Sequence, residues 1–542
     1  MKSSLLSKLF MLTLLLSNLY SSQINLAWLQ EQPKSFARDF YILQFLNQEI
    51  TPTQAIEALE LIHNMNYKLF FAYAKKLQHD ETYAVVQCLQ ASTKELIQTN
   101  ADCIAAGLST YEMTTLTYIQ KKELYEKLKE KYPQKAATLL ILNSPLPFTK
   151  LIASHNEGFF DVFNQVGAAY IKHYFNYKLP KNRLEQLQID TKFNQTIKII
   201  VTNLELSNLQ TSLLKEFKAD ILTSDSLFYL GINALRHNHN ELAINYFKAA
   251  SQKNYLRFEK DKINFWLYQT TKDKSYLETL NKSNDINIYT LFAKEQFKEV
   301  FTNIEYDIKQ LDEKSSFDVT NPFLWQKIKN ELTTNYDIKK YEHLFTQEYS
   351  KPNLAYIYEK YNKYQKHYFI TPYESFLKEQ STQRKALIYA LAKQESHLIA
   401  SAISPSYALG VMQIMPFLAK HLSQKSKESF NIYAQLNPKI SITYANEHLN
   451  YLEEHLSHPL FIAYAYNGGI GFTQQMLKTD IFDLDKKEYE PYLSMELVPV
   501  DESRKYGKKV LANYFIYYNH LNPKNKTVFS TLIQTIKKSH HK

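Results

Sequence analysis

Residues 385–422 read KALIYALAKQESHLIASAISPSYALGVMQIMPFLAKHL, and this stretch is the most informative part of the chain. Ile388, Leu391 and Ala392 lie seven, four and three residues before Glu395, so on a helix the four side chains share one face. A carboxylate at the end of an apolar stripe loses hydration, which disfavours the ionised form and raises its pKa. The alternative is a carboxylate at the edge of the core that is paired with a cation. Glu395 is therefore a candidate proton donor.

Further motifs follow Glu395 in a fixed order. The chain continues with a turn signal at Ser404 and Pro405, and then with GVMQIMP at residues 410–416, AYNGG at residues 465–469, and ELVP at residues 496–499 followed by Glu502, Arg504 and Tyr506. This ordered set resembles the soluble lytic transglycosylases, which are murein-cleaving enzymes with a goose-lysozyme-like catalytic domain. The resemblance covers roughly the last 175 residues, and several separated motifs in family order are more specific than any one motif.

Length and composition indicate a mainly α protein with several domains. A chain of 542 residues is too long for one core, so we expect roughly two to four domains. Only nine residues are Gly, which favours long helices with few tight turns. The resemblance implies an N-terminal α-superhelical solenoid of helix pairs, followed by a lysozyme-like α (α+β) catalytic domain. The expected divisions are a signal peptide at 1–22, the solenoid at 23–300, a helical linker region at 301–365 and the transglycosylase domain at 366–542.

One helix pair can be identified within the expected solenoid. Small and apolar residues are spaced along two consecutive helices, namely Leu227, Leu230, Gly231 and Ala234 on the first and Ala243, Phe247 and Ala250 on the second. This pattern resembles a tetratricopeptide-type unit. Only one such unit is clear, so we expect a degenerate solenoid and not a regular array. An ordinary helical bundle fits the same periodicity.

The N-terminus has the pattern of a secretory signal. Lys2 and Lys8 precede an apolar run at residues 9–16, which is followed by small and polar residues at 17–22. The run is too short to span a membrane, and the alternative is an uncleaved anchor. We therefore expect export to the periplasm.

If the protein is exported, its two cysteines, Cys88 and Cys103, are candidates for a disulfide. On one continuous helix a separation of fifteen residues would place them about 22 Å apart, beyond the reach of a disulfide. A turn between them, for example at Thr99 and Asn100, would form an antiparallel helix pair and could bring the sulfurs together. An oxidising compartment favours such a bond. Neither cysteine has the surroundings of a catalytic nucleophile.

The spacing of carboxylates bears on the reaction. Splitting a glycosidic bond usually takes two carboxylates. After Glu395 the next two are Glu428 and Glu447, and neither lies in a motif. This arrangement suits the one-acid mechanism that the resemblance implies. In that mechanism a lone Glu protonates the oxygen between N-acetylmuramic acid and N-acetylglucosamine, then takes the proton from the muramyl six-hydroxyl, and leaves a 1,6-anhydromuramyl end.

The resemblance also implies roles for the motif residues. The expected set is Glu395 as acid and then base, Ser404 near the acetamido group or the Glu carboxylate, Gln413 and Met415 in the groove lining, Tyr466 and Asn467 around the sugar ring and Glu395, and Glu496 in the groove wall. Ser396 is expected to brace the helix end, Gly410 to permit a close backbone approach, and Arg504 to form a structural pair with Glu502. Core packing is an equal alternative for Met415.

The sequence departs from the family pattern at two places. Tyr407 stands where the family usually has Gly, in the loop that borders the groove. Gly468, Gly469 and Ile470 stand where Ala-Gly-Pro is usual. Both departures affect the shape of a loop, and neither removes the acid.

Charge and composition indicate which classes of binding partner to expect. The net charge is +10, and a basic surface would speed encounter with the carboxylates of murein peptide stems. An exported protein rarely meets nucleic acid, so nucleic acid is not an expected partner. The sixteen His show no metal-ligand spacing and no phosphate-binding Gly loop is present, so we expect no metal and no cofactor. The expected partners are peptidoglycan glycan strands, with cell-wall synthesis or secretion complexes as further candidates, and the chain is expected to be a monomer.

Two other functions fit the same residues. A hydrolytic muramidase on this fold would keep Glu395 and admit water as the nucleophile. A non-catalytic glycan-binding scaffold would have no obvious reason to keep Glu395 together with Gln413, Tyr466 and Asn467.

Overall fold

The computed structural model describes residues 24–77, 80–333, 337–483 and 488–536. The expected signal peptide at residues 1–22 lies outside these described residues. The described chain is mostly helical, which confirms the mainly α fold class. Its two short strands, β1 (Ile304–Glu305) and β2 (His367–Tyr368), pair in parallel with Ile304 opposite His367. Among the described residues, none of the helices combines the length and apolar character needed to cross a bilayer.

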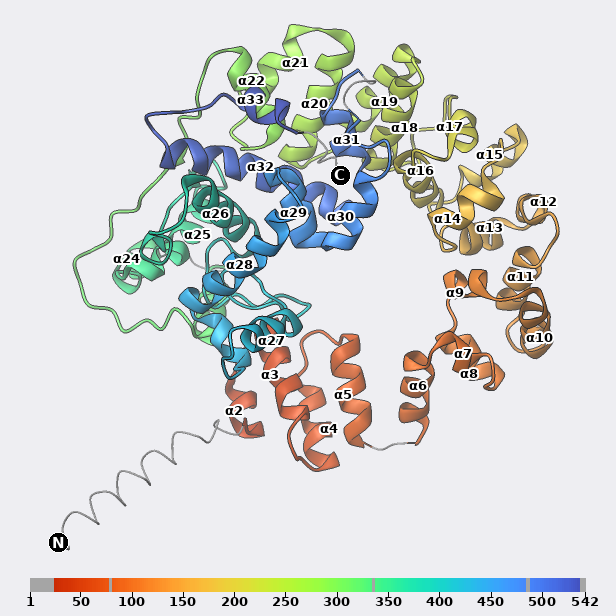
Figure 1. The fold of residues 1–542 in the computed structure, drawn as a ribbon, viewed down its shortest axis with the longest axis horizontal. Coiled ribbons are helices and arrows are strands. Elements are labelled where there is room, and N and C mark those ends of the chain that lie inside the picture. Colours follow the sequence, from red (N-terminus) through yellow and green to blue (C-terminus); the bar gives the residue numbers. More distant parts are fainter. Residues whose placement is uncertain (1–23, 78–79, 334–336, 484–487, 537–542) are drawn as a thin grey trace, which may run out of the picture.

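The first part of the chain is a curved succession of short helices. In Figure 1 they run from the bottom of the molecule, around the right side, to the top. They are α2 (Leu26–Glu31), α3 (Phe36–Leu46), α4 (Pro52–Glu60), α5 (Tyr67–Leu77), α6 (Asp80–Gln90), α7 (Thr93–Leu96), α8 (Ala101–Gly107), α9 (Thr110–Thr115), α10 (Tyr118–Leu128), α11 (Pro133–Leu142), α12 (Pro147–Ala153), α13 (Asn156–Phe163), α14 (Ala168–Tyr170), the π-helical turn Ile171–Phe175, α15 (Lys181–Leu187), α16 (Phe193–Thr202), α17 (Ser207–Ser212), α18 (Ser224–Arg236), α19 (Asn240–Gln252), α20 (Arg257–Thr271), α21 (Lys274–Asn281) and α22 (Ile288–Gln296).

Local sequence explains why these helices start where they do. Thr51, Ser92, Ser109 and Thr117 each precede a helix, and each side chain accepts a hydrogen bond from the backbone N–H three residues on. In all four cases the Glu or Gln at that position accepts a hydrogen bond from the capping residue's backbone N–H in return. These reciprocal caps satisfy backbone groups that a helix end otherwise leaves without a partner.

The helix pair predicted from the sequence is α18 and α19. All seven of its predicted contact residues are buried. A β carbon added to Gly231 would lie 2.5 Å from the Phe247 ring, so the two helices cross at a place where no side chain fits. Gly at this position therefore sets the close packing of the pair.

Cys88 of α6 and Cys103 of α8 form a disulfide, with their Cα atoms 5.1 Å apart. The chain reverses between them through α7, and the side chain of Asn100 caps the start of α8 by accepting from Cys103 N. The turn that the sequence suggested is thus present.

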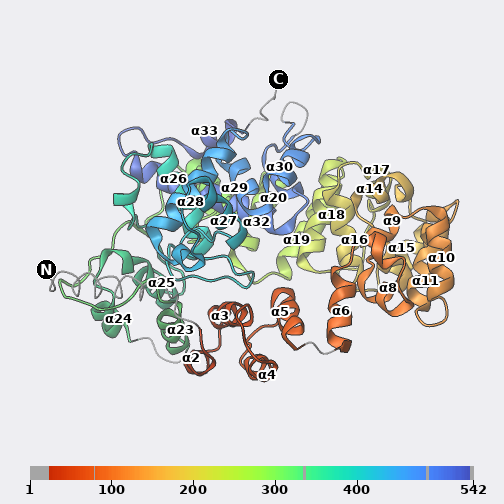
Figure 2. The ribbon, with the colours of Figure 1, turned by 60° about the horizontal axis from the view of Figure 1, so that its bottom comes forward.

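The last part of the chain packs against both ends of the curve. Its helices are α23 (Pro322–Glu331), α24 (Ile338–Leu344), α25 (Lys351–Tyr361), α26 (Thr382–Ser396), α27 (Pro416–Lys425), α28 (Pro438–Glu453), α29 (Pro459–Gly468), α30 (Ile470–Leu477), α31 (Tyr492–Leu497), α32 (Asp501–Leu521) and α33 (Phe529–Gln534), with 3-10 turns at Glu348–Ser350, Glu374–Phe376 and Ile432–Leu436. Helix α32 packs on α26, α29 and α22. In Figures 1 and 2 these helices lie between the first and last helices of the curve, so the chain closes on itself.

Aromatic side chains make the contact at the N-terminal end of the curve. The Trp28 and Phe323 rings lie 5.3 Å apart in an edge-on arrangement. Tyr41 of α3 stacks on Tyr433 at 5.2 Å. Rings in these geometries bury a large apolar area and fix the relative orientation of their helices.

Candidate active site

Glu395 lies in the last turn of α26. Ile388, Leu391 and Ala392 are each at most 1% exposed, which confirms the apolar face that the spacing predicts. The helix ends at Ser396, and the next residue, His397, adopts a left-handed conformation with φ of 53°. The carboxylate of Glu395 therefore projects from the end of a buried face into a partly buried position.

The surroundings of Glu395 favour its protonated form. Burial, which is the largest effect, and the nearby carboxylate of Glu502 raise its pKa, while a hydrogen bond from Tyr506 lowers it. The pKa that results from all three effects is raised to about 7. The Tyr506 hydroxyl donates this bond to Glu395 Oε1 at 2.7 Å. The C-terminal end of a helix is also its negative end, which disfavours a carboxylate there. Glu395 can therefore hold a proton near neutral pH and release it.

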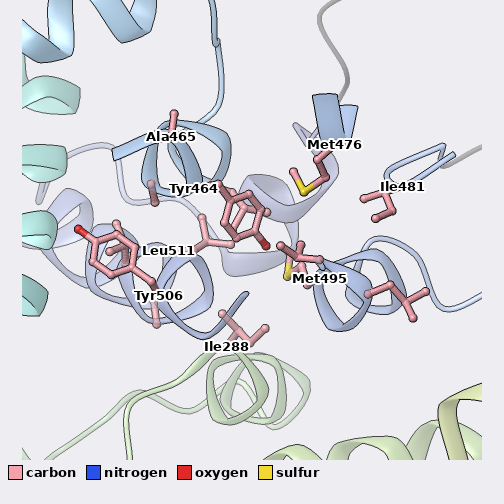
Figure 3. Close-up of a cluster of buried hydrophobic side chains, with 14 of the residues drawn as sticks. Ile288, Tyr464, Ala465, Met476, Ile481, Met495, Tyr506 and Leu511 are labelled. Atoms are coloured by element: carbon pink, nitrogen blue, oxygen red, sulfur yellow. The ribbon is translucent and has the colours of Figure 1, made fainter. Parts of the chain in front are cut away.

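Helix α32 presents Tyr506 to the acid. Gly507, the next residue, lets the helix approach α29, because a β carbon there would lie 2.1 Å from the Tyr464 ring. Figure 3 shows the Tyr506 ring at the edge of the apolar cluster, with its hydroxyl pointing away from Met495. Burial and the nearby Glu395 raise the pKa of Tyr506 well above its ordinary value, so the hydroxyl remains a donor.

A compact loop, residues 402–414, packs against the end of the helix that carries Glu395. Gly410 has φ of 79°, and a β carbon there would lie 1.9 Å from the Gln435 carbonyl oxygen, which confirms the expected close backbone approach. Gln413 donates through Nε2 to the carbonyls of Ala402 and Gly410 at 3.1 and 2.8 Å. Backbone bridges join Leu409 to residues 403 and 414. The loop is thus held by its own hydrogen bonds.

Tyr466 connects this loop to the acid. Its hydroxyl donates to the Met412 carbonyl at 2.7 Å, and its pKa is raised well above the ordinary value by burial and by the nearby charge of Glu395. Ser404 Oγ accepts from Ala408 N at 2.9 Å within the loop. Met415 immediately precedes α27 and is partly buried.

Ser396 braces the end of α26, as expected, because its Oγ donates to the Val411 carbonyl at 2.7 Å. Asn467 bridges α29 and α32: Ser503 Oγ donates to its Oδ1 at 2.7 Å, and its Nδ2 donates to Glu502 Oε1 at 3.1 Å. Asn467 therefore orients the second carboxylate near Glu395.

Glu496 lies elsewhere than expected. It is 1% exposed, and Lys508 Nζ lies 2.6 Å from its Oε2. Tyr289 donates to its Oε1, and Trp266 Nε1 lies 3.5 Å from the same atom. Glu496 joins α31 and α32 to α20 and α22, in the interior and not in a groove wall. The ELVP motif does not reveal this position, because Trp266 and Tyr289 are more than 200 residues away in the sequence.

The other charged residues considered from the sequence, Arg504, Glu428 and Glu447, form structural contacts. Arg504 is 2% exposed and pairs with Asp501 at 2.5 Å, and it also donates to the Val498 carbonyl. Arg504 was expected to pair with Glu502, and this prediction is wrong because its ion-pair partner is Asp501. Glu428 accepts from Tyr444 at 3.0 Å, and Glu447 pairs with Lys425.

Sequence reasoning missed the roles of two residues. Tyr506 was named within the last motif, but nothing in the sequence indicates that it bonds Glu395. The sequence also does not indicate that Glu502 lies near Glu395, because this proximity depends on how α26 and α32 pack. Within the part of the chain that the structure describes, no group of three or more His, Cys, Asp or Glu side chains could hold a metal ion.

The region around Glu395 matches a known domain family. Residues 373–489 match the family model described as Transglycosylase SLT domain. Over 144 residues the chain is 31% identical to the soluble lytic murein transglycosylases of Salmonella typhimurium and Escherichia coli, an alignment that covers 26% of this chain and 21% of each relative. The chain thus aligns with about a fifth of the length of the curated relatives it matches.

Solved structures give a weaker likeness over a longer range. The 70 kDa soluble lytic transglycosylase of Escherichia coli superposes with a TM-score of 0.44 at 16% identity, covering 94% of this chain and 84% of that one. The chain carries a transglycosylase SLT domain, homologous to that of the soluble lytic murein transglycosylases.

Proposed function

We propose that the chain is a peptidoglycan lytic transglycosylase. It cleaves the β-1,4 bond between N-acetylmuramic acid and N-acetylglucosamine without water and leaves 1,6-anhydromuramyl ends. The observation that carries this proposal is Glu395 itself: a partly buried carboxyl group that accepts one tyrosine hydrogen bond and has a pKa raised to about 7. Among the described residues it forms no ion pair. A general acid works best when its pKa lies near the working pH.

The reaction then needs two proton transfers through the same carboxyl group. Glu395 gives its proton to the glycosidic oxygen as the bond from the anomeric carbon breaks, and N-acetylglucosamine leaves with a hydroxyl group. The acetamido group of the muramyl sugar stabilises the positive charge that develops at the anomeric carbon. The ionised Glu395 next takes the proton of the muramyl six-hydroxyl, whose oxygen bonds to the anomeric carbon. Glu395 ends the cycle protonated, and no water is consumed.

The surrounding residues hold the participants in place. Tyr506 stabilises the ionised form of Glu395 that exists between the two proton transfers, because its hydroxyl donates to the carboxylate. Tyr466 fixes the loop that carries Gln413 through its bond to the Met412 carbonyl. We assign Ser404, Gln413, Met415, Tyr466 and Asn467 to the lining of the glycan groove. Glu496, being interior, is assigned no contact with substrate.

One observation favours a second candidate, a hydrolytic muramidase. Glu502 is an exposed carboxylate close enough to raise the pKa of Glu395. A second carboxylate near the acid is what a hydrolase uses to activate water or to form a glycosyl intermediate. In the proposed transglycosylase Glu502 only tunes Glu395, so Glu502→Gln should change the pH profile and leave the product unchanged.

Digestion of purified murein sacculi in oxygen-18 water distinguishes the two reactions. Products are separated and identified by mass, with Glu395→Gln protein as the blank. The proposal predicts anhydromuramyl ends without label. Reducing muramyl ends that carry oxygen-18 would instead make the protein a hydrolase, and Glu502→Gln would then abolish their formation.

The proposed substrate implies an exported protein. The disulfide between Cys88 and Cys103 fits an oxidising compartment such as the periplasm. We infer that residues 1–22 direct export, that residues 23–300 form the superhelical region, and that a linker at 301–365 leads to a catalytic domain starting near residue 366. Glycan strands are the proposed partner, and the chain is proposed to act as a monomer.

A further inference from the structure

The loop that borders the acid contains a tight turn at residues 404–408. Ser404 N donates to the Ala408 carbonyl at 3.0 Å, and Tyr407 N donates to the Ser404 carbonyl at 2.9 Å. Tyr407 has φ of 67°, in the left-handed region that residues with a β carbon rarely adopt. Gly would meet this backbone requirement without strain. The presence of Tyr therefore needs a reason that lies in its side chain.

The Tyr407 side chain completes the core of another part of the molecule. Helices α2 to α5 enclose a small apolar cluster, separate from the main core, whose fully buried members from these helices are Leu29, Phe40, Ile42, Phe45, Leu46, Ala55, Ala58 and Leu69. Two more buried members come from the loop, Tyr407 and Leu409. Tyr407 is 1% exposed, and its ring centre lies 5.8 Å from that of Phe40. Figures 1 and 2 both place α3 directly beside this part of the C-terminal region.

Polar contacts fasten the same turn to the segment around α5. Lys68 Nζ donates to the Ser406 carbonyl at 2.9 Å and lies 5.7 Å from the centre of the Tyr407 ring. Asn66 Nδ2 donates to the Pro405 carbonyl at 3.3 Å. Two consecutive loop carbonyls and the side chain that follows them are thus held by the N-terminal helices.

The other side of the loop holds the candidate active site. Gly410 N donates to the Ala402 carbonyl at 2.9 Å, and Gln413 bonds the same carbonyl. The Met412 carbonyl accepts a hydrogen bond from the hydroxyl of Tyr466, and Tyr466 lies close to Glu395. The turn at 404–408 is therefore a short link between the N-terminal helices and the groove lining.

We propose that Tyr407 is a positioning residue, which anchors the groove-bordering loop to helices α2–α5 so that the N-terminal end of the chain sets the shape of the glycan groove. The proposal rests on the proposed function for its effect on turnover. The anchor itself is a property of the structure and can be measured without substrate. Its physical basis is that the apolar contacts of the ring compensate for the left-handed backbone, and this compensation exists only while α3 and α5 are in place.

Tyr407→Gly tests the anchor, because it suits the left-handed backbone and removes only the side chain. We expect the backbone amides of residue 404 and of residues 406–410 to exchange hydrogen at least tenfold faster than in the wild type. We expect kcat on a soluble murein oligosaccharide to fall at least fivefold well below the melting temperature. Tyr407→Phe keeps the ring and should restore turnover to within threefold of the wild type. Phe40→Ala perturbs the same contact from the opposite side and should accelerate exchange at the same loop amides.

Tyr364→Gly is the matched control, because Tyr364 also has a positive φ, of 56°, but is 44% exposed. It should leave exchange at 404–410 and turnover at wild-type levels. Wild-type exchange at these amides in Tyr407→Gly would overturn the anchor. Faster exchange with unchanged kcat would overturn the positioning role and leave a purely structural contact. If the wild type forms no muramyl product, the proposed function fails, and the exchange data still decide whether the anchor exists.

Discussion

Two glutamates of the C-terminal region, Glu395 and Glu496, show how surroundings decide what a carboxylate does. Glu395 accepts a tyrosine hydroxyl, has another carboxylate nearby, and has a pKa raised to about 7. Glu496 also accepts a tyrosine hydroxyl, but it lies 2.6 Å from a Lys508 ammonium, which holds its pKa below the ordinary value. Glu496 is the more deeply buried of the two. The cation, and not the depth of burial, therefore determines which one can donate a proton.

The comparison predicts its largest effect at the buried pair. Glu496→Gln keeps the side-chain shape but leaves the Lys508 ammonium without a counter-charge at 2% exposure. Breaking a buried ion pair in this way costs about 3–5 kcal/mol of folding free energy. The loss should appear as a lower midpoint in urea unfolding at pH 7. Because the folded-state pKa of Glu496 is lowered, its stabilising effect is present above the unfolded pKa of about 4.3 and disappears as the pH falls through the folded value.

The double variant Glu496→Leu with Lys508→Met provides the control. Removing both charges avoids an uncompensated ion, so the double variant should be more stable than Glu496→Gln. Equal instability of the two would mean that Glu496 stabilises the junction through Tyr289 and Trp266 and not through Lys508.

The next largest effect concerns turnover. Glu395→Gln keeps the size and the hydrogen bond from Tyr506 but removes the titrating proton. The rate on sacculi should fall by at least about 100-fold, the amount that a general acid typically contributes. Binding of glycan, measured by co-sedimentation with sacculi, should survive. A purified variant that clears sacculi at a near wild-type rate would contradict the assignment.

Tyr506→Phe should shift the pH profile of turnover. The proposed reaction starts from protonated Glu395, so kcat/KM should decline as the pH rises through its pKa of about 7. The Tyr506 hydroxyl stabilises the ionised form, and its removal should move this alkaline limb upward by on the order of one pH unit. A shift downward, or none, would show that the hydrogen bond does not control the acid.

The two glutamates should also differ in the sign of their effect on stability. The folded-state pKa of Glu395 is raised, so its contribution is fully present below the unfolded pKa of about 4.3 and is lost as the pH rises through about 7. At pH 8 the folded protein therefore bears the cost of a partly buried charge. Glu395→Gln should raise the free energy of unfolding at pH 8 by about 1 kcal/mol after allowance for solvent screening, and change little at pH 4. Destabilisation at pH 8 would contradict the comparison.

The sequence predicted those features that depend on neighbours along the chain. The apolar face before Glu395 follows from helical spacing, and the close approach at Gly410 follows from its place in a compact motif. The packing of Gly231 against Phe247 is a contact between consecutive helices. The disulfide needed only a turn between two nearby cysteines. Each of these features involves residues no more than about thirty positions apart, a range over which periodicity and turn-forming residues predict the structure.

The sequence could not predict features that depend on distant packing. Glu496 was expected in the groove wall because the resemblance of its motif to that of the lytic transglycosylases implied this place. In the structure it lies in the interior, where Trp266 and Tyr289 contact it. Tyr407 was recognised as a departure from Gly, and its partner Phe40 lies 367 positions earlier. Tyr506 bonds Glu395 across 111 residues. These contacts are fixed by how the curved helical region closes on the C-terminal helices, which no local pattern contains.

The smallest expected effect is at Tyr466, where the comparison concerns a hydroxyl and not a carboxylate. Tyr466→Phe keeps the ring but removes the bond to the Met412 carbonyl at 2.7 Å. A hydrogen bond of this kind contributes about 0.5–1.5 kcal/mol, so turnover should slow by roughly two- to tenfold if the loop is oriented through it.

Tyr464→Phe, two residues earlier on α29, is the control, because the Tyr464 hydroxyl is buried without a hydrogen-bond partner in the described structure. In the proposed reaction, a looser loop should hold the six-hydroxyl less firmly before it opens the opposite face of the sugar to solvent. The products of Tyr466→Phe in oxygen-18 water should therefore remain unlabelled anhydro ends, and substantial label would show that Tyr466 excludes water instead of orienting the sugar.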